Sequence, residues 1–249
     1  MTDPAIDTDD LTKRYGELTA LDGLDLTVDR GEVYGFLGPN GAGKSTTIGL
    51  LMNYSKPTSG TARVLGMDPW TDVVDCHQRV GILPDRFDTY ADRSARRHLQ
   101  LVADTKRADD DPVGLLERVG LGDAVDRPAG EFSQGMEQRL ALAMSLVGDP
   151  ELLILDEPFT GLDPHGVALV RDVVESESDR GTTVFFSSHV LGQVELVCDR
   201  VGILHRGRLV DEGTLSAFRD RLDLTADATV EDVFVHLTDG AADRAEGPR

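Results

Sequence analysis

The segment GPNGAGKST, residues 38–46, has a composition suited to holding phosphate groups. It matches the pattern GxxxxGK followed by Ser or Thr, and it lies between a β-rich segment and a helical one, as that pattern requires. Its glycines let backbone N–H groups point inward around an anion, and the next helix start adds about half a positive charge. We expect it to bind a nucleotide, with Lys44 at the β- and γ-phosphates and Ser45 on Mg²⁺. The binding residues predicted here are Gly38, Pro39, Asn40, Gly41, Ala42, Gly43, Lys44, Ser45 and Thr46.

A second candidate for chemistry is LLILDEP, residues 152–158, where an apolar run ends in two acids. An acid at the end of a buried strand supplies the other half of a P-loop nucleoside triphosphatase site. We expect Asp156 to hold Mg²⁺ through water and Glu157 to polarise the attacking water. Acids at strand ends are common, but this pair follows the phosphate-binding segment by roughly a hundred residues, which makes the assignment specific.

Short β-rich segments alternate with helical patterns along most of the chain. This alternation predicts an α/β domain with a largely parallel sheet. The strand patterns are at 24–28, 32–38, 152–158 and 182–189, with a hairpin over 201–213 that turns at Arg206–Gly207; the helical patterns are at 44–54, 136–147 and 167–178.

The middle of the chain has no strand pattern. Between about Asp85 and Asp149 the segments 93–104 and 113–120 are helical, so we expect a helical subdomain at 85–149 inserted into the α/β core. The ordered chain should end in a helix capped by Thr229, with Asp232 three residues later. We therefore predict one domain over 1–240, with a C-terminal extension at 222–240 and a disordered tail at 241–249.

The charge balance excludes some functions. With 45 acidic against 25 basic residues the formal charge is −20, which disfavours nonspecific nucleic-acid binding. Asp outnumbers Glu, and lysine is found only at positions 13, 44, 56 and 106. We interpret this bias as adaptation to a salt-rich (halophilic) cytoplasm, where counterions screen self-repulsion. An acidic protein of a low-salt cell is the alternative.

The cysteines, the first residues and the apolar runs predict where in the cell the protein is located. Cys76 and Cys198 lie far apart without metal-ligand spacing, which favours reduced thiols in a cytosolic protein. The first residues, MTDPAIDTDD, lack the apolar core of a signal peptide. The longest apolar runs are far shorter than the ~18 residues that a membrane span needs. We expect a cytoplasmic protein that reaches a membrane only through a partner.

Five motifs, in this order and spacing, make the chain resemble the ATP-binding subunit of an ABC transporter: GPNGAGKST, FSQGM, LLILDEP, GLDP and SSH. The resemblance runs from about Leu11 to Leu237. It implies the ABC ATPase fold, with a mostly parallel core sheet, an antiparallel β subdomain and an inserted helical subdomain. It also implies ATP hydrolysis with Mg²⁺ by a head-to-tail dimer, expected to be a homodimer. That dimer would drive a separate integral membrane permease from the inner face of the cell membrane.

FSQGM, residues 132–136, stands where the family usually has LSGGQ. The resemblance implies that Ser133 and the backbone at Gly135 bind the γ-phosphate held by the opposite subunit's P-loop. A helix start has free N–H donors and a positive dipole end, which suits this role. An ordinary serine N-cap is the alternative, and it would account for Ser133 but not for Gly135.

The resemblance assigns four further residues. Asp163 in GLDP would touch its counterpart across the dimer, and His189 in SSH would contact the γ-phosphate and order the catalytic water. Tyr15 would stack on adenine. A structural histidine and an ordinary surface tyrosine are the alternatives for these last two. Asp85 stands where the Q-loop usually has Gln, and its shorter side chain makes direct contact with Mg²⁺ a weaker expectation than a link to the helical subdomain.

The segment TVEDVFVHLT, residues 229–238, resembles the LEDVFL tail of ATPase subunits that serve type-2 exporter permeases, and the acidic Q-loop agrees. Export is therefore the expected direction. The alternative is a soluble ABC-type ATPase that acts on ribosomes or DNA without a permease. Such proteins carry two cassettes or a long coiled coil, whereas this chain has one cassette, no heptads and no basic patch. A regulatory ATPase subunit without a transport partner stays open.

Overall fold

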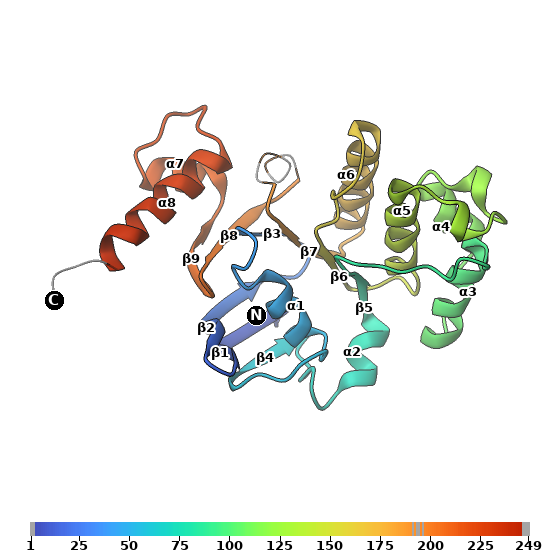
Figure 1. Ribbon diagram of the computed structural model, residues 1–249, viewed down its shortest axis with the longest axis horizontal. Coiled ribbons are helices and arrows are strands. Elements are labelled where there is room, and N and C mark those ends of the chain that lie inside the picture. Colours follow the sequence, from blue (N-terminus) through green and yellow to red (C-terminus); the bar gives the residue numbers. More distant parts are fainter. Residues whose placement is uncertain (1–2, 191, 193–194, 196, 246–249) are drawn as a thin grey trace.

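A computed structural model describes residues 3–190, 192, 195 and 197–245. Strands and helices alternate through most of this length (Figure 1). The strands are β1 (Ile6–Tyr15), β2 (Leu18–Val28), β3 (Val33–Leu37), β4 (Ser59–Val64), β5 (Val80–Leu83), β6 (Leu152–Asp156), β7 (Thr183–Ser188), β8 (Arg200–His205) and β9 (Arg208–Gly213). The helices are α1 (Lys44–Leu51), α2 (Val73–Arg79), α3 (Ala95–Lys106), α4 (Pro112–Arg118), α5 (Gln134–Ser145), α6 (Pro164–Asp179), α7 (Leu215–Arg221) and α8 (Val230–Ala245), with 3₁₀ turns η1 (Gly122–Ala124) and η2 (Ala129–Glu131).

Two sheets make up the β-structure. The six-stranded sheet has the order β5-β6-β7-β3-β8-β9, and all its neighbours are parallel except β8 and β9. The three-stranded sheet, β2-β1-β4, is antiparallel. The expected mostly parallel core sheet with an antiparallel β subdomain is therefore confirmed. So is the hairpin turn at Arg206–Gly207, where both residues have positive φ, 50° and 80°.

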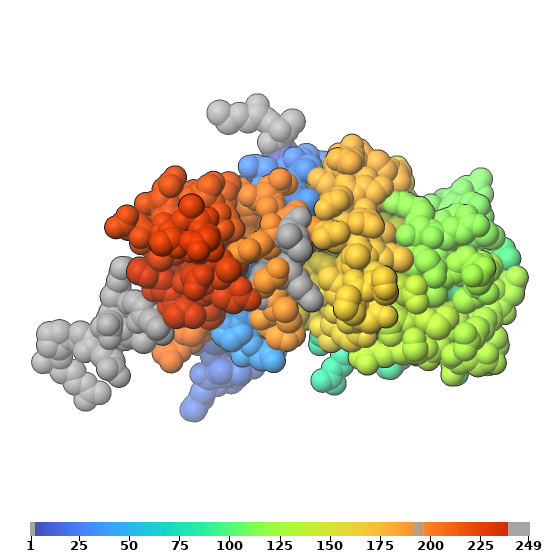
Figure 2. Space-filling view, turned by 90° about the horizontal axis from the view of Figure 1, so that it is seen from above, coloured from blue at the N-terminus to red at the C-terminus, as the bar shows by residue number. Residues whose placement is uncertain are grey.

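Each face of the large sheet buries a separate core. In β3, Tyr34 and Phe36 pack toward the antiparallel sheet and α1, whereas Val33 and Leu37 pack toward the helices. Every residue of β3 is buried, as expected of a central parallel strand covered on both sides. Figure 2 shows the helical face, with α7 and α8 at one end and the green helical segment at the other.

Residues 85–149 contain α3, α4, η1, η2 and α5. Side-chain caps start the first two of these helices, since Ser94 accepts from Arg97 N and Asp111 accepts from Val113 N. This segment packs on the edge of the sheet, where α5 lies against β5. The guanidinium of Arg118 in α4 binds the buried carboxylate of Glu177 in α6.

Helix α8 begins with the predicted capping box. Thr229 N donates to Asp232 Oδ2 over 2.8 Å, and Asp232 N donates to Thr229 Oγ1 over 3.2 Å. The helix then runs to Ala245, past residue 240 where the ordered chain was expected to end. Residues 246–249 of the expected tail lie outside the described part of the chain.

Within the described residues, every helix is too short or too polar to cross a bilayer.

Candidate functional site

The loop between β3 and α1 is shaped by glycines. Gly43 has φ 116°, and a Cβ there would lie 2.8 Å from the Ala20 carbonyl oxygen. A Cβ at Gly38 would lie 2.4 Å from the Leu204 carbonyl oxygen. Only glycine fits at either position, so the loop can run close to β2 and β8 and turn directly into α1.

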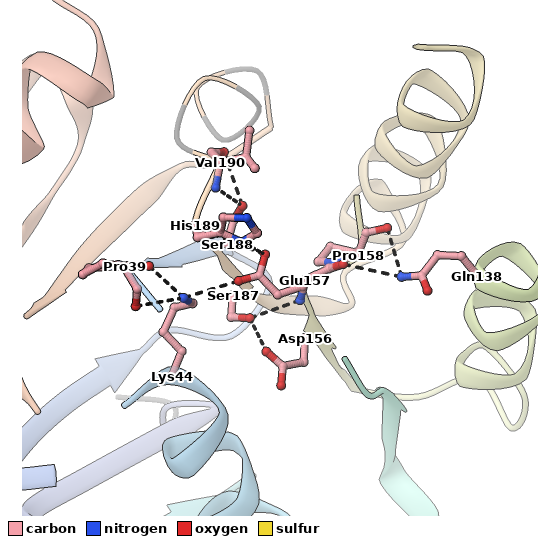
Figure 3. Close-up of polar contacts among 11 residues, drawn as sticks. Pro39, Lys44, Gln138, Asp156, Glu157, Pro158, Ser187, Ser188, His189 and Val190 are labelled. Carbon is pink, nitrogen blue, oxygen red and sulfur yellow. Dashed lines mark hydrogen bonds and ion pairs between the residues drawn. The ribbon is translucent and has the colours of Figure 1, made fainter. Parts of the chain in front are cut away.

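Lys44, the first residue of α1, is folded over this loop (Figure 3). Its Nζ donates to Gly38 O over 2.7 Å and to Pro39 O over 3.4 Å. It also lies 3.3 Å from Glu157 Oε1, and both side chains are almost fully buried. This ion pair joins the phosphate-binding loop to the end of β6.

Glu157 connects β6 with the end of β7. Its Oε2 accepts from the His189 backbone N–H over 3.3 Å and from His189 Nδ1 over 2.8 Å. A carboxylate accepts, so Nδ1 carries the proton, and none of the described residues forms a hydrogen bond with Nε2. Glu157 has φ 53°, a left-handed conformation that costs a non-glycine residue about 1–3 kcal/mol.

Asp156 lies deeper, at the end of β6. Its burial raises the pKa of its carboxyl, with the charges of Asp85 and Glu157 adding to the rise, while hydrogen bonding by Ser187 and Ser45 opposes it. The carboxylate of Asp156 and the hydroxyl of Ser45 are oxygen donors, which is what Mg²⁺ takes together with water and phosphate oxygens. The described residues hold no cluster of three or more His, Cys, Asp or Glu that could bind a metal by itself. The donor set therefore fits Mg²⁺ brought in with a nucleotide.

A cavity of about 540 Å³ brings most of the predicted residues together. Tyr15 stands at its edge, 51% exposed, with Lys13 Nζ 4.8 Å from its ring centre. Gly38 and Ala42 are not among the lining residues, and they contribute through the loop backbone instead. The predicted residues in the lining are Tyr15, Pro39, Asn40, Gly41, Gly43, Lys44, Ser45, Thr46, Asp85, Glu157 and His189.

Ser133, Gly135 and Asp163 lie elsewhere, around a second cavity of about 400 Å³ that none of the loop residues lines. Ser133 is the N-cap of α5, with Met136 N 3.4 Å from its Oγ, so the capping role is present within the chain. Asp163 caps α6 by accepting from Gly166 N over 2.7 Å. A Cβ at Gly135 would meet its nearest neighbour, Leu162, at 3.6 Å, an ordinary contact. Packing within one chain therefore does not require glycine at 135.

Two residues of the site had no predicted role. Ser187 in β7 bonds both Asp156 and Glu157 N. Gln138, near the start of α5, donates through Nε2 to Pro158 O over 3.3 Å (Figure 3). The only sequence signal for Ser187 is a polar residue at the end of an apolar strand.

Comparisons with known proteins agree on one family. The sequence profile described as ABC transporter matches residues 21–160. The bacitracin transport ATP-binding protein of Bacillus licheniformis is 42% identical over 83% of this chain and 69% of its own length. The daunorubicin/doxorubicin resistance ATP-binding protein of Streptomyces peucetius is 39% identical over 88% and 68%. A solved ATP-binding subunit of an ABC transporter superposes with TM-score 0.87 at 28% identity, covering 94% of this chain and 99% of its own.

Proposed function

The chain belongs to the ABC transporter family as an ATP-binding subunit, and on that premise we propose that it hydrolyses ATP to drive a separate permease in export. The relatives named above serve bacitracin transport and resistance to daunorubicin and doxorubicin, by their names. They support this function over a soluble ATPase acting on ribosomes or DNA. The tail at 229–238 supports the export direction.

The main support for a site shared between two chains is that the predicted phosphate-binding residues line two separate cavities. Lys44 and Glu157 line one cavity, and Ser133 and Gly135 line the other, so one chain does not assemble both halves around one nucleotide. The free N–H groups and positive dipole at the start of α5 suit a phosphate that this chain does not hold itself. Two chains arranged head-to-tail would complete two sites, each with one chain's loop and the other's Ser133. Close approach of a phosphate also explains a glycine at 135.

The contacts around Glu157 support the following proposal for hydrolysis. A γ-phosphate would draw Lys44 away from Glu157 and leave that carboxylate free to take a proton from the attacking water. His189, bonded to Glu157 through Nδ1, would hold the carboxylate and face the phosphate with Nε2. Mg²⁺, held by Ser45 and through water by Asp156, would neutralise charge on the β- and γ-phosphates. The products are ADP and phosphate.

A groove beside the nucleotide cavity is the proposed contact for the permease. It has a volume of about 410 Å³ and a mostly apolar lining that includes Pro84, Phe87, Leu101 and Met144. Pro84 and Phe87 flank Asp85, which lines the nucleotide cavity. One short loop thus borders both spaces, so a permease segment seated in the groove would respond to the nucleotide.

Ser133→Arg tests the two-chain site. The added side chain would occupy the place of the opposite phosphate, so we expect parental affinity for ATP but loss of ATP-dependent dimerisation and turnover. Fluorescent ATP binding, light scattering and phosphate release measure these quantities. Thr214→Arg is the matched control, because Thr214 is also an exposed N-cap but lies at the start of α7. Parental turnover in Ser133→Arg would refute the cross-subunit arrangement.

A further inference from the structure

Ser187 is a buried serine that lies between the two acids of the site (Figure 3). It belongs to β7, and its partner in the parallel ladder is Asp156 of β6. Its exposed fraction is 0%, so its hydroxyl depends entirely on protein partners. Both groups that the hydroxyl bonds, the Asp156 carboxylate and the Glu157 backbone N–H, belong to residues proposed to act in hydrolysis.

The direction of its two hydrogen bonds is fixed. Glu157 N donates to Ser187 Oγ over 3.1 Å, and the Ser187 hydroxyl donates to Asp156 Oδ1. A backbone N–H can only donate, so Ser187 Oγ must accept there, and its single proton is left for Asp156. One hydroxyl therefore orients two groups. These are the Asp156 carboxylate, which is proposed to hold Mg²⁺, and the backbone of Glu157, whose carboxylate is proposed to act on the attacking water.

Glu157 depends on this support because its backbone is left-handed, with φ 53°. Its N–H also approaches Ser187 O at 3.2 Å, so both acceptors that hold it belong to one residue. If the Glu157 backbone relaxed, its carboxylate would leave the positions 3.3 Å from Lys44 and 2.8 Å from His189.

We propose that Ser187 is a positioning residue for ATP hydrolysis, which aligns Asp156 and Glu157 through one shared hydroxyl. This inference rests on the proposed roles of those two acids. Ser187 does not line the nucleotide cavity, so it acts on the rate only through its neighbours. The bond from β7 to the phosphate-binding loop is made by Ser188 instead, whose carbonyl accepts from Gly38 N over 3.3 Å. Nucleotide affinity in the absence of Mg²⁺ should therefore be largely independent of the Ser187 hydroxyl.

Ser187→Ala removes the hydroxyl and keeps the strand. We expect kcat for ATP hydrolysis to fall about 10- to 100-fold, the loss typical of a misplaced catalytic group. The affinity for a fluorescent ATP analogue without Mg²⁺ should stay within about twofold of the parent. The factor by which Mg²⁺ strengthens analogue binding should fall, because Asp156 is no longer oriented. Ser187→Thr restores the hydroxyl and should recover most of kcat and of the Mg²⁺ effect.

Ser145→Ala is the matched control. Ser145 is 2% exposed and donates to Leu142 O over 2.7 Å, within α5 and outside the nucleotide cavity. We expect Ser145→Ala to lower the melting temperature without changing kcat. A parental kcat in Ser187→Ala, or an equal loss of kcat in Ser145→Ala, would overturn the proposal. If Ser187→Ala does not fold, Ser187→Cys keeps the shape of the side chain, weakens the donor and serves for the same comparison.

A double mutant separates positioning from general damage. In a Glu157→Gln background, Ser187→Ala should lower the residual rate much less than it does in the parent, since the group it orients is already disabled. Fully additive losses would contradict the proposal. Its failure is distinct from failure of the proposed function, which would show as parental hydrolysis by Glu157→Gln alone.

Discussion

Glu157 is contacted from three parts of the chain, by Lys44, Ser187 and His189. Lys44 and His189 could be predicted as site residues from motifs whose order along the chain is diagnostic. The Ser187 contact could not be predicted, because a serine in a strand has no spacing signature. Its bonding partners depend on the register of β6 against β7, which pairs it with Asp156. The residues that take part in the chemistry are therefore easier to predict from the sequence than the residues that position them.

Glu157→Gln should bind ATP but hydrolyse it about 10²- to 10⁴-fold more slowly, because the amide cannot accept the proton of the attacking water. ATP-bound closed dimers should then accumulate. Lys44→Ala is the informative contrast, because losing the phosphate-binding ammonium should weaken nucleotide affinity itself. Phosphate release and equilibrium binding separate the two outcomes. Parental hydrolysis by Glu157→Gln would refute the role of Glu157 as base.

At the scale of elements, the buried strands β3, β6 and β7 and the helices α1, α5 and α6 could be predicted, because apolar runs and helical spacing mark them. Strands β1, β4 and β5 could not. The sequence of β1, IDTDDLTKRY, is largely polar, and its ladder is irregular between Thr8 and Leu11. Strand β5 is short and contains Gly81, where a Cβ would lie 2.0 Å from the Ser145 carbonyl oxygen. Because α5 packs so closely, only glycine fits at position 81. A glycine in so short a segment weakens the β-rich pattern by which a strand is predicted.

Leu101→Glu tests the groove between α3, α5 and β5. Leu101 lines the groove and is 44% exposed, so a carboxylate there should prevent an apolar permease segment from docking. We expect the integral membrane protein that co-purifies with the tagged parent from detergent extracts to be lost, with ATP binding unchanged. Val235→Glu is the control, because Val235 is 54% exposed on α8, at the other end of the molecule (Figure 1). Equal recovery with both variants would contradict the docking site. Ribosomal proteins in place of a membrane protein would overturn the transport function.

At the scale of the whole molecule, 45 acidic residues against 25 lysines and arginines leave a formal charge of −20. Arginine supplies the cation of every ion pair in the described residues except those that Lys44 and His189 form with Glu157. The other lysines are few, and two of them are bound to carbonyls: Lys13 to Lys56 O, and Lys106 to Val80 O and Val147 O. Acidic residues thus far outnumber the lysine amines, and adaptation to high salt stays a prediction from composition alone.

The unfolding midpoint should rise as KCl increases from about 0.1 M to about 1 M, since the screening length falls from about 10 Å to about 3 Å. Screening relieves repulsion among the acids in the compact state more than in the expanded one. Thermal unfolding followed by circular dichroism at each salt concentration measures the effect. Full stability in dilute buffer, with no further gain in KCl, would contradict the salt-adaptation interpretation.

The two separate cavities also predict how two mutant alleles of the gene would behave in one cell. In the proposed head-to-tail homodimer, a cell that makes both Lys44→Ala and Ser133→Arg chains would pair them at random, so about half of its dimers would be mixed. In a mixed dimer one site combines the two damaged halves, while the other combines two intact halves. Two alleles that are each inactive alone would therefore complement one another when expressed together.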